Sequence, residues 1–242
     1  MWTIRIEGTG SSGNCSVVND SILMDMGLSA KRMADDFGIV TAALITHRHG
    51  DHVTDGALSA FFKQRPAIFK NQLYMPMDVR DAVVERGHAQ AMDAVSHIPE
   101  EHLLRGGETF GLRTRSGKYM VTCFMVPHGD VPNLGYVIEN EDGSRLLWAT
   151  DLENLGTLPQ GKFDAICLEG SYDETVLGAA LDDPVLATRA ASNLRHLPIA
   201  DFERFVTERA NTNALVVQLH QSKDFGRRSP LNTCAEGDVI SG

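Results

Sequence analysis

The chain has 242 residues, 43% of them hydrophobic, and a net charge of −10 from 22 basic and 32 acidic residues. This is ordinary globular composition, and its acidic balance excludes a broad electrostatic surface for nucleic acid. The sequence contains neither an apolar run of the ~18–20 residues that a membrane helix needs nor a signal peptide. None of its four cysteines forms a Cys-x-x-Cys pair. We therefore expect a reduced, cytoplasmic protein without membrane association.

The first half of the chain alternates short strands with short helices. Apolar alternation and turn residues predict strands over residues 2–6, 16–18, 21–24 and 73–76. Helical spacing, with Ser29 as an N-cap and Gly87 as a stop, predicts helices over residues 29–37, 55–62 and 78–86. Pro66 should close the second of these helices. Residues 88–107 show no clear period and predict no element.

Strands dominate the second half. Turn residues predict one hairpin over residues 110–115 and 118–125 and another over 134–139 and 145–149. Further strands over residues 164–168 and 214–219 flank an amphipathic helix over 198–210. The last residues contain few apolar side chains. We therefore predict a single domain over residues 1–225 and a poorly ordered tail over residues 226–242.

One stretch, Ala-Leu-Ile-Thr-His-Arg-His-Gly-Asp-His at residues 43–52, is unusually rich in metal-binding side chains. Its apolar start predicts a buried strand, and residues two apart in extended chain point the same way, so His47 and His49 converge. The turn at Gly50 re-aims Asp51 and His52 toward a second point nearby. Imidazole and carboxylate are ligands for zinc, manganese and iron. The stretch therefore supplies partial ligand sets for two adjacent ions.

Candidate ligands also follow the ends of four later apolar strands: His128, Asp151, Glu169 and His220. Polar groups at strand ends often build active sites, because the sheet holds their geometry while loops carry the chemistry. Together with the first stretch, these side chains complete two metal sites. Ligands so far apart in sequence require a folded scaffold rather than the local loop of a zinc finger.

With these residues, the chain resembles the metallo-β-lactamase-fold hydrolases over nearly its whole length. The resemblance implies an α/β fold, an αββα sandwich of two mixed sheets flanked by helices. It also assigns seven ligands to two divalent ions, with His47, His49 and His128 on one, Asp51, His52 and His220 on the other, and Asp151 bridging them. It further implies that Asp25 orients the histidine loop instead of binding metal. Zinc and manganese fit these ligands equally well.

Two motifs are similar to phosphodiesterase branches of the family. The segment Gly-Ser-Ser-Gly-Asn-Cys at residues 10–15 resembles the nuclease-like WalJ (YycJ) branch. Arg195-His196-Leu197 resembles the extra histidine motif of phosphodiesterases such as tRNase Z, where a glutamate matching Glu169 assists that histidine. Residues 198–199 are Pro-Ile where WalJ-like proteins have Ser-Asn, and residues 171–173 are Ser-Tyr-Asp where they have Asn-His-Asp. The substrate is therefore less well indicated than the ligands.

The resemblance implies a dinuclear metal-dependent phosphodiesterase. The net charge of −10 and the scattered basic residues favour a substrate gripped over few phosphates: nucleic-acid ends, short oligonucleotides or small (cyclic) nucleotides. A hydroxide between the ions would attack phosphorus, with Asp51 orienting it and His196, supported by Glu169, as the candidate general acid. Two alternatives stay open: a glyoxalase-II-like thioester or other carboxylic ester hydrolase, and a non-catalytic metal-binding module. The basic residues of the 110–125 hairpin, Arg113, Arg115 and Lys118, are interpreted as a solvated face. The sequence leaves a homo-oligomer undecided.

Overall fold

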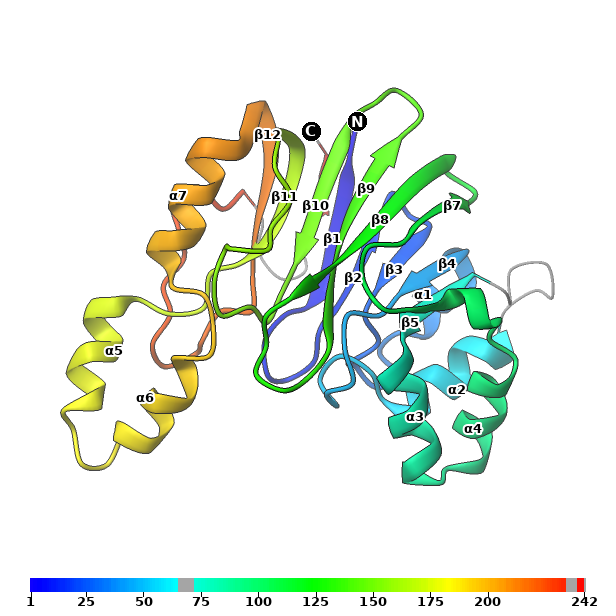
Figure 1. The fold of residues 1–242 in the computed structure, drawn as a ribbon, viewed down its shortest axis with the longest axis horizontal. Coiled ribbons are helices and arrows are strands. Elements are labelled where there is room, and N and C mark those ends of the chain that lie inside the picture. Colours follow the sequence, from blue (N-terminus) through cyan, green and yellow to red (C-terminus); the bar gives the residue numbers. More distant parts are fainter. Residues whose placement is uncertain (65–71, 234–238, 242) are drawn as a thin grey trace.

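Two β-sheets pack face to face at the centre of the molecule, and helices cover both outer faces (Figure 1). The structure, a computed structural model, describes residues 1–64, 72–233 and 239–241, the last three by their backbone alone. Within these ranges one sheet has seven strands in the order β13-β1-β2-β3-β4-β5-β6, and the other has six in the order β12-β11-β10-β9-β8-β7. The predicted αββα sandwich of two mixed sheets is confirmed.

The seven-stranded sheet combines an antiparallel and a parallel half. Its strands are β1 (Thr3–Gly8), β2 (Cys15–Val18), β3 (Ile22–Met24), β4 (Ala42–Leu44), β5 (Leu73–Pro76), β6 (Leu103–Leu104) and β13 (Val239–Ser241). Strands β3 to β6 run parallel, so each connection must cross back over the sheet. The crossovers contain α1 (Ala34–Ile39), α2 (Asp55–Gln64), α3 (Met77–Arg86), α4 (Ala89–Ser96) and the 3₁₀ turn Glu100–His102.

The six-stranded sheet also combines an antiparallel and a parallel half. Its strands are β7 (Thr109–Arg113), β8 (Lys118–Val126), β9 (Asn133–Asn140), β10 (Arg145–Ala149), β11 (Phe163–Glu169) and β12 (Ala210–Leu219). Strands β7 to β10 are antiparallel, whereas β10, β11 and β12 are parallel. Helix α7 (Ile199–Arg209) covers the outer face, and α5 (Glu174–Leu181) and α6 (Ala187–Asn193) project beyond it (Figure 1).

Successive side chains of a strand point to opposite faces of its sheet and therefore enter different hydrophobic cores. In β1, Ile4 and Ile6 join the core between the sheets, together with Tyr136 and Trp148 from the opposite sheet. A second core lies between the seven-stranded sheet and α1 to α4, and a third between the other sheet and α7. Because apolar burial stabilises every layer, strand ends are held firmly enough to place polar side chains. None of the helices in the described ranges is both long and apolar enough to cross a bilayer.

Several helices differ from the expectation. Ser29 accepts a weak hydrogen bond from the Arg32 amide, but residues 30–33 form turns and α1 begins only at Ala34. Helix α4 lies where no element was predicted, because two of the three residues on its buried face are alanines, which give a weak periodic signal. Helices α5 and α6 were also not predicted. Strand β12 begins at Ala210, inside the range expected to be helical.

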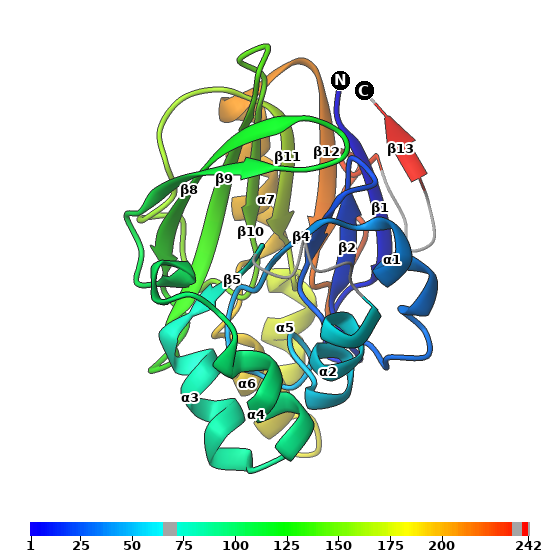
Figure 2. The same ribbon diagram turned by 90° about the vertical axis from the view of Figure 1, so that its right-hand side faces the viewer.

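The described part of the expected tail is packed against the domain. Arg227 pairs with Asp173 and Glu203, and the side chain of Ser229 is buried. Strand β13 pairs with β1, which brings the two ends of the described chain together (Figure 2). Hydrogen bonds and ion pairs thus hold residues 226–233 against the domain where apolar burial is scarce, and the division into a domain over residues 1–225 and a tail over residues 226–242 stays a prediction. Pro66, residues 234–238 and residue 242 lie outside the described residues.

Candidate metal centre

The predicted site residues meet at one edge of the sandwich. The histidine stretch follows β4, His128 follows β8, Asp151 follows β10, and His220 follows β12. Glu169 is the last residue of β11, and His196 lies between α6 and α7. The structure thus brings every predicted metal and catalytic residue into three overlapping groups that share Asp151. Both sheets contribute, so the cluster exists only in the folded chain.

The first group contains His47, His49, His128 and Asp151. Nε2 of His47 lies 3.0 Å from Nδ1 of His49, which lies 3.3 Å from Nε2 of His128. Oδ2 of Asp151 lies 3.3 Å from Nε2 of His47. Ligand atoms about 2.1 Å from a tetrahedral ion are about 3.4 Å from one another. These separations therefore match a shared ion.

The second group contains Asp51, His52, His220 and again Asp151. Nε2 of His52 is 2.8 Å from Oδ2 of Asp151 and 3.7 Å from Oδ2 of Asp51. Nε2 of His220 is 3.1 Å from Oδ1 of Asp151, a buried oxygen that makes no hydrogen bond of good geometry to the residues described. Oδ2 of Asp151 thus lies against histidines of both groups and Oδ1 against His220 of the second, so this carboxylate stands between the two groups.

A third group joins Glu169 and His196 to Asp151 and His220. Nδ1 of His196 is 2.8 Å from Oε1 of Glu169 and 3.8 Å from Oδ1 of Asp151. The other oxygen of Glu169 accepts the Leu152 amide at 2.6 Å, which fixes this fully buried carboxylate. The His196 ring stacks on His220 with centroids 4.7 Å apart. Nε2 of His196 therefore remains available beside the ligand cluster.

The charges of these groups suit a cation. Burial lowers the pKa of His47 well below its ordinary value and also lowers that of His128, which favours the neutral imidazole that binds metals. Although burial opposes it, His220 and His52 hold the pKa of Asp151 well below its usual range. The carboxylates of Asp151 and Asp25 outweigh burial and raise the pKa of His52 to about 10. The donor set and the buried negative charge therefore fit divalent metal ions.

Three residues around the cluster have a left-handed backbone. Asp25, Asp151 and His220 follow strand ends with φ of 61°, 52° and 49°. Such conformations cost of order 1–3 kcal/mol for a residue other than glycine, and they persist only where the surrounding structure enforces them. At each of these positions the left-handed conformation changes the direction of the chain where the strand ends, and with it the direction in which the side chain points. These strained positions mark the same edge of the sandwich as the ligand groups.

Two buried residues orient the histidine loop. Oδ2 of Asp25 accepts Nδ1–H of His52 at 2.8 Å, which leaves Nε2 of His52 facing the ligand cluster. Thr46 supports Asp25 by donating both its amide and its hydroxyl to that carboxylate. The position of Asp25 agrees with the orienting role implied by the family resemblance.

Asn14 was given no role by sequence reasoning, yet it contacts the same loop. Its Nδ2 lies 2.8 Å from Nε2 of His52 and 3.4 Å from Oδ2 of Asp51. Its backbone amide donates to the Asp51 carbonyl at 2.6 Å. The sequence signal for it was its place in the Gly-Ser-Ser-Gly-Asn-Cys segment at residues 10–15, whose small residues let the backbone come close to the histidine loop.

Gly27 permits this close packing. A Cβ atom at position 27 would lie 1.7 Å from the carbonyl oxygen of Asp51 and 2.8 Å from the amide nitrogen of Asn14. We expect Gly27→Ala to push the loop carrying Asp51 and His52 away from the cluster. Zinc affinity, measured by competition with a chromogenic chelator, should fall by about 10- to 100-fold, the usual cost of disturbing support around a metal site.

Gly56→Ala is the matched control, because a Cβ at this position in the first turn of α2 meets no atom within 4 Å. Alanine favours a helix over glycine, so this variant should keep its metal affinity and be no less stable. Unchanged zinc affinity in Gly27→Ala would contradict the proposed role of the close contact.

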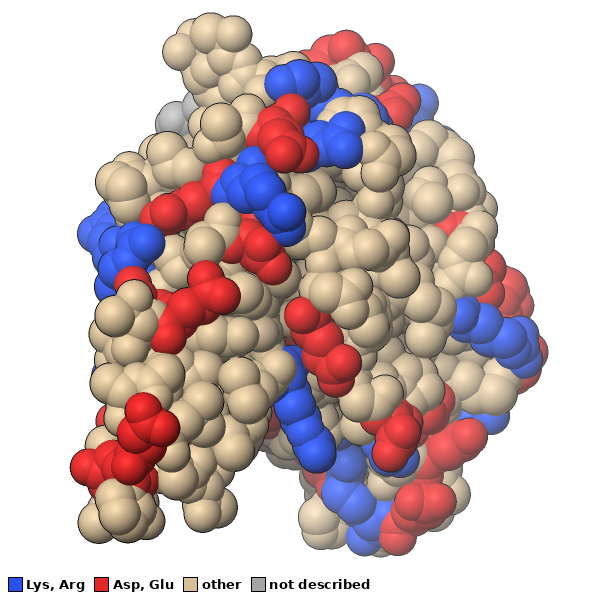
Figure 3. All heavy atoms as spheres, turned by 60° about the vertical axis from the view of Figure 1, so that its left-hand side comes forward, with Lys and Arg blue, Asp and Glu red and all other residues tan. Residues whose placement is uncertain are grey.

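The molecule is hollowed between two helical lobes. Figure 1 shows α5 and α6 on one side and α2 to α4 on the other, below the sheets, and the surface view in Figure 3 has a notch between two lobes on the same side of the molecule. Acidic and basic side chains are interspersed across the face shown in Figure 3. That face therefore presents no continuous basic strip.

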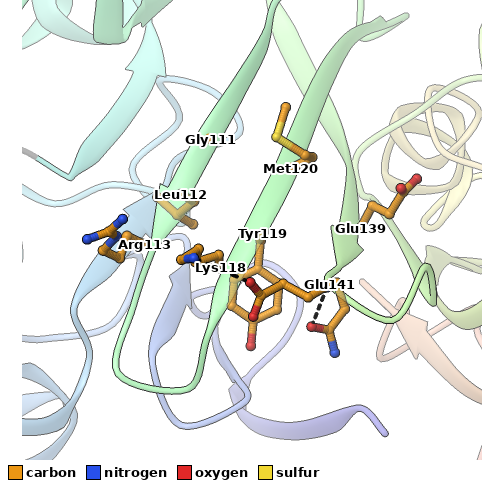
Figure 4. A pocket seen from close by; sticks show the side chains of 9 residues that line it. Gly111, Leu112, Arg113, Lys118, Tyr119, Met120, Glu139 and Glu141 are labelled. Carbon is orange, nitrogen blue, oxygen red and sulfur yellow. Dashed lines mark hydrogen bonds and ion pairs between the residues drawn. The ribbon is translucent and has the colours of Figure 1, made fainter.

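A separate hollow of about 350 Å³ lies on the hairpin of β7 and β8 (Figure 4). Lys118 at its edge pairs with Glu141 at 3.6 Å. His128 lies beyond the opposite end of β8, and a nine-residue strand is roughly 30 Å long at 3.3 Å per residue. The hairpin's basic side chains are therefore remote from the metal cluster, which agrees with their interpretation as a solvated face.

Comparison with known families identifies the domain type. A family profile described as the beta-lactamase superfamily domain matches residues 21–199, well over half of the chain. This range contains every site residue predicted from the sequence except His220. No curated protein sequence matches the chain.

Solved structures with a similar fold have low sequence identity. YhfI from Bacillus subtilis, a metallo-beta-lactamase fold protein, has a TM-score of 0.65 and 14% identity, with 100% of both chains covered. The short form of human tRNase Z has a TM-score of 0.61 and 17% identity, covering 99% of this chain and 98% of that one. A possible metal-dependent hydrolase from Veillonella parvula has a TM-score of 0.59 and 14% identity, covering 99% and 98%. These matches show the shared fold.

Proposed function

Because this chain belongs to the beta-lactamase superfamily, we propose that its metal cluster hydrolyses phosphodiesters, at nucleic-acid ends or in short or cyclic nucleotides. The superfamily and the histidine–aspartate groups support a metal-dependent hydrolase. The finer proposal concerns two ions, zinc or manganese, held by the first and second ligand groups. His47, His49 and His128 would hold one ion, Asp51, His52 and His220 the other, and Asp151 both.

The observation that carries the phosphodiester proposal is the pair formed by His196 and Glu169. Nδ1 of His196 donates to Oε1 of Glu169 at 2.8 Å, and this contact raises the pKa of His196 although burial opposes it. Nε2 would then carry a proton beside the cluster. An alkoxide leaving a phosphodiester needs that proton, whereas a thiolate leaving a thioester does not, because thiols are far more acidic. The pair therefore favours phosphodiesters over thioesters.

Each remaining residue has a distinct task in this proposal. Bound divalent ions supply Lewis-acid chemistry, polarising a phosphoryl group and lowering the pKa of water. Asp51 is partly exposed, so one carboxylate oxygen could accept a hydrogen bond from the attacking water and orient it. Asp25 and Asn14 hold His52 in place. His196 would deliver the proton to the departing oxygen.

The proposed size of the substrate follows from the net charge of the protein and from how its arginines are paired. Net charge is −10, and many arginines are already paired with carboxylates, including Arg86 with Asp55 and Arg227 with Glu203. A protein that grips many phosphates needs a row of free cations, and its affinity then falls steeply with salt. We propose that this protein contacts only two or three phosphates of its substrate.

The test is kcat/KM on short oligonucleotides, cyclic nucleotides and long duplex DNA across a salt series, with zinc and manganese each supplied. We expect the short substrates to be preferred, with a slope of log kcat/KM against log salt no steeper than about −3. A preference for long duplex with a slope indicating about six or more phosphates would contradict the size limit. Hydrolysis of a glutathione thioester but of no phosphodiester would establish the alternative activity.

A further inference from the structure

Two of the candidate histidine ligands, His128 and His220, differ from His52 in how they are supported. A histidine ligand usually donates its other ring N–H to an acceptor, as His52 does to Asp25. Nδ1 of His128 and Nδ1 of His220 are buried, and neither makes a hydrogen bond of good geometry with any residue in the described part of the chain. Nδ1 of His220 lies 3.3 Å from Oε1 of Glu169. The backbone around each ring therefore carries more of its positioning.

Thr9 fixes the backbone of His220 and joins the two sheets at this point. Its hydroxyl oxygen accepts the amide of His220 at 2.7 Å, although the two residues are 211 positions apart in the chain. Thr9 directly follows β1 of the seven-stranded sheet, and His220 directly follows β12 of the other. The left-handed backbone of His220 persists only where its surroundings enforce it. Thr9 therefore holds this strained residue against the sheet whose β4 leads to Asp51.

Glu153 fixes the loop that carries His128. Its Oε1 accepts the amide of Gly129 at 2.7 Å, and its own amide donates to the carbonyl of Pro127 at 3.0 Å. One residue thus holds the chain on both sides of His128. Glu153 lies two positions after Asp151, whose carbonyl accepts a separate hydrogen bond from Asn133. Removal of the Glu153 side chain therefore leaves that support of Asp151 in place.

We propose that Glu153 and Thr9 are positioning residues that separately set the metal affinity of the first and second ligand groups. The inference rests on the two-ion site proposed above. Glu153 acts through His128, which belongs only to the first group, and Thr9 acts through His220, which is absent from the first group. The two contacts share no residue, so the loss of one leaves the other ligand supported.

The test measures zinc affinity by competition with a chromogenic chelator in two backgrounds that each retain one ligand group. His49→Ala leaves the second group, and Asp51→Ala leaves the first. In the His49→Ala background, Thr9→Val should weaken zinc binding about 10- to 100-fold, because valine has the shape of threonine but no acceptor for the amide. In the Asp51→Ala background Thr9→Val should have no effect. Glu153→Ala should show the opposite pattern.

Thr9→Ser and Glu153→Gln keep the hydrogen-bond acceptor and test the positioning role directly. Both should bind zinc as tightly as the parent protein. Glu153→Gln also removes the negative charge, so an equal loss of affinity in Glu153→Gln and Glu153→Ala would assign the effect to charge and overturn the positioning role. An equal loss in Thr9→Ser and Thr9→Val would overturn the role of the hydroxyl contact.

Thr3→Val and Glu208→Ala are the matched controls, since Thr3 is at the other end of β1 and Glu208 is an exposed residue of α7. Both should keep the affinity of the parent protein in either background. The melting temperature of each metal-free variant should fall by no more than ~2–4 °C, the effect of losing about 1 kcal/mol of hydrogen bonding. An affinity loss of the same size in both backgrounds would indicate general destabilisation and contradict separate positioning.

Failure of this inference is distinguishable from failure of the two-ion proposal. Unchanged affinities in Thr9→Val and Glu153→Ala, with two ions bound by the wild type, would overturn the inference while the two-ion proposal stands. Saturation of the wild type at one ion would overturn that proposal instead. The background that still binds zinc then decides: weaker binding on loss of its own positioning residue alone supports the inference, and weakening by both or by neither contradicts it.

Discussion

Replacing Asp151 with alanine should lower the metal content from two ions per chain to one or none and slow hydrolysis by about a thousandfold or more. Its two oxygens face both ligand groups, at 3.3 Å from Nε2 of His47 and 3.1 Å from Nε2 of His220. Loss of metal charge stabilisation costs several kcal/mol in the transition state, and each 1.36 kcal/mol is tenfold in rate. Elemental analysis after metal titration, together with kcat/KM, measures both effects.

Asp182→Ala is the control, because this residue at the C-terminal end of α5 is far along the chain from every candidate ligand and exposed. It should bind two ions and keep full activity. Saturation of the wild-type protein at one ion, with normal metal content in His220→Ala, would contradict the dinuclear arrangement. That result would assign the single ion to the first ligand group, His47, His49, His128 and Asp151.

Replacing His196 with alanine should slow hydrolysis of substrates with poor leaving groups by about 100- to 10,000-fold while leaving the metal content unchanged. Bis-p-nitrophenyl phosphate should lose much less activity, because its leaving oxygen needs little protonation. The structural basis is the contact of Nδ1 with Oε1 of Glu169, which leaves Nε2 beside the cluster. The measurement is kcat/KM for wild type and variant on a series of aryl and alkyl phosphodiesters.

The slope of log kcat/KM against leaving-group pKa separates acid catalysis from positioning. Loss of a general acid makes that slope steeper, whereas loss of a positioning contact lowers all rates by the same factor. His97→Ala is the control, since this exposed histidine bonds to the end of α4 and lies beside Phe62 of α2, and it belongs to none of the ligand groups. It should match wild type on every substrate. An equal loss across the series in His196→Ala would assign His196 a positioning role.

The candidate metal ligands could be picked out from the sequence because their signals are local. Residues 43–52 combine a buried strand with four ligand side chains, and His128, Asp151 and His220 each follow an apolar strand. Side-chain type and period-two alternation are properties of neighbouring residues, so they can be recognised before the fold is known. The sequence by itself therefore determined the candidate ligand types, the strand ends that carry them and, through the family resemblance, the αββα sandwich.

The tertiary structure alone decided which distant residues touch. The contact of Asn14 with His52 and the approach of Gly27 to Asp51 depend on how separate segments pack. Helix α4 and the packing of residues 226–233 also escaped prediction, since alanines and polar residues give little periodic signal. Such contacts arise from the register of whole layers, and no short stretch of sequence contains that register.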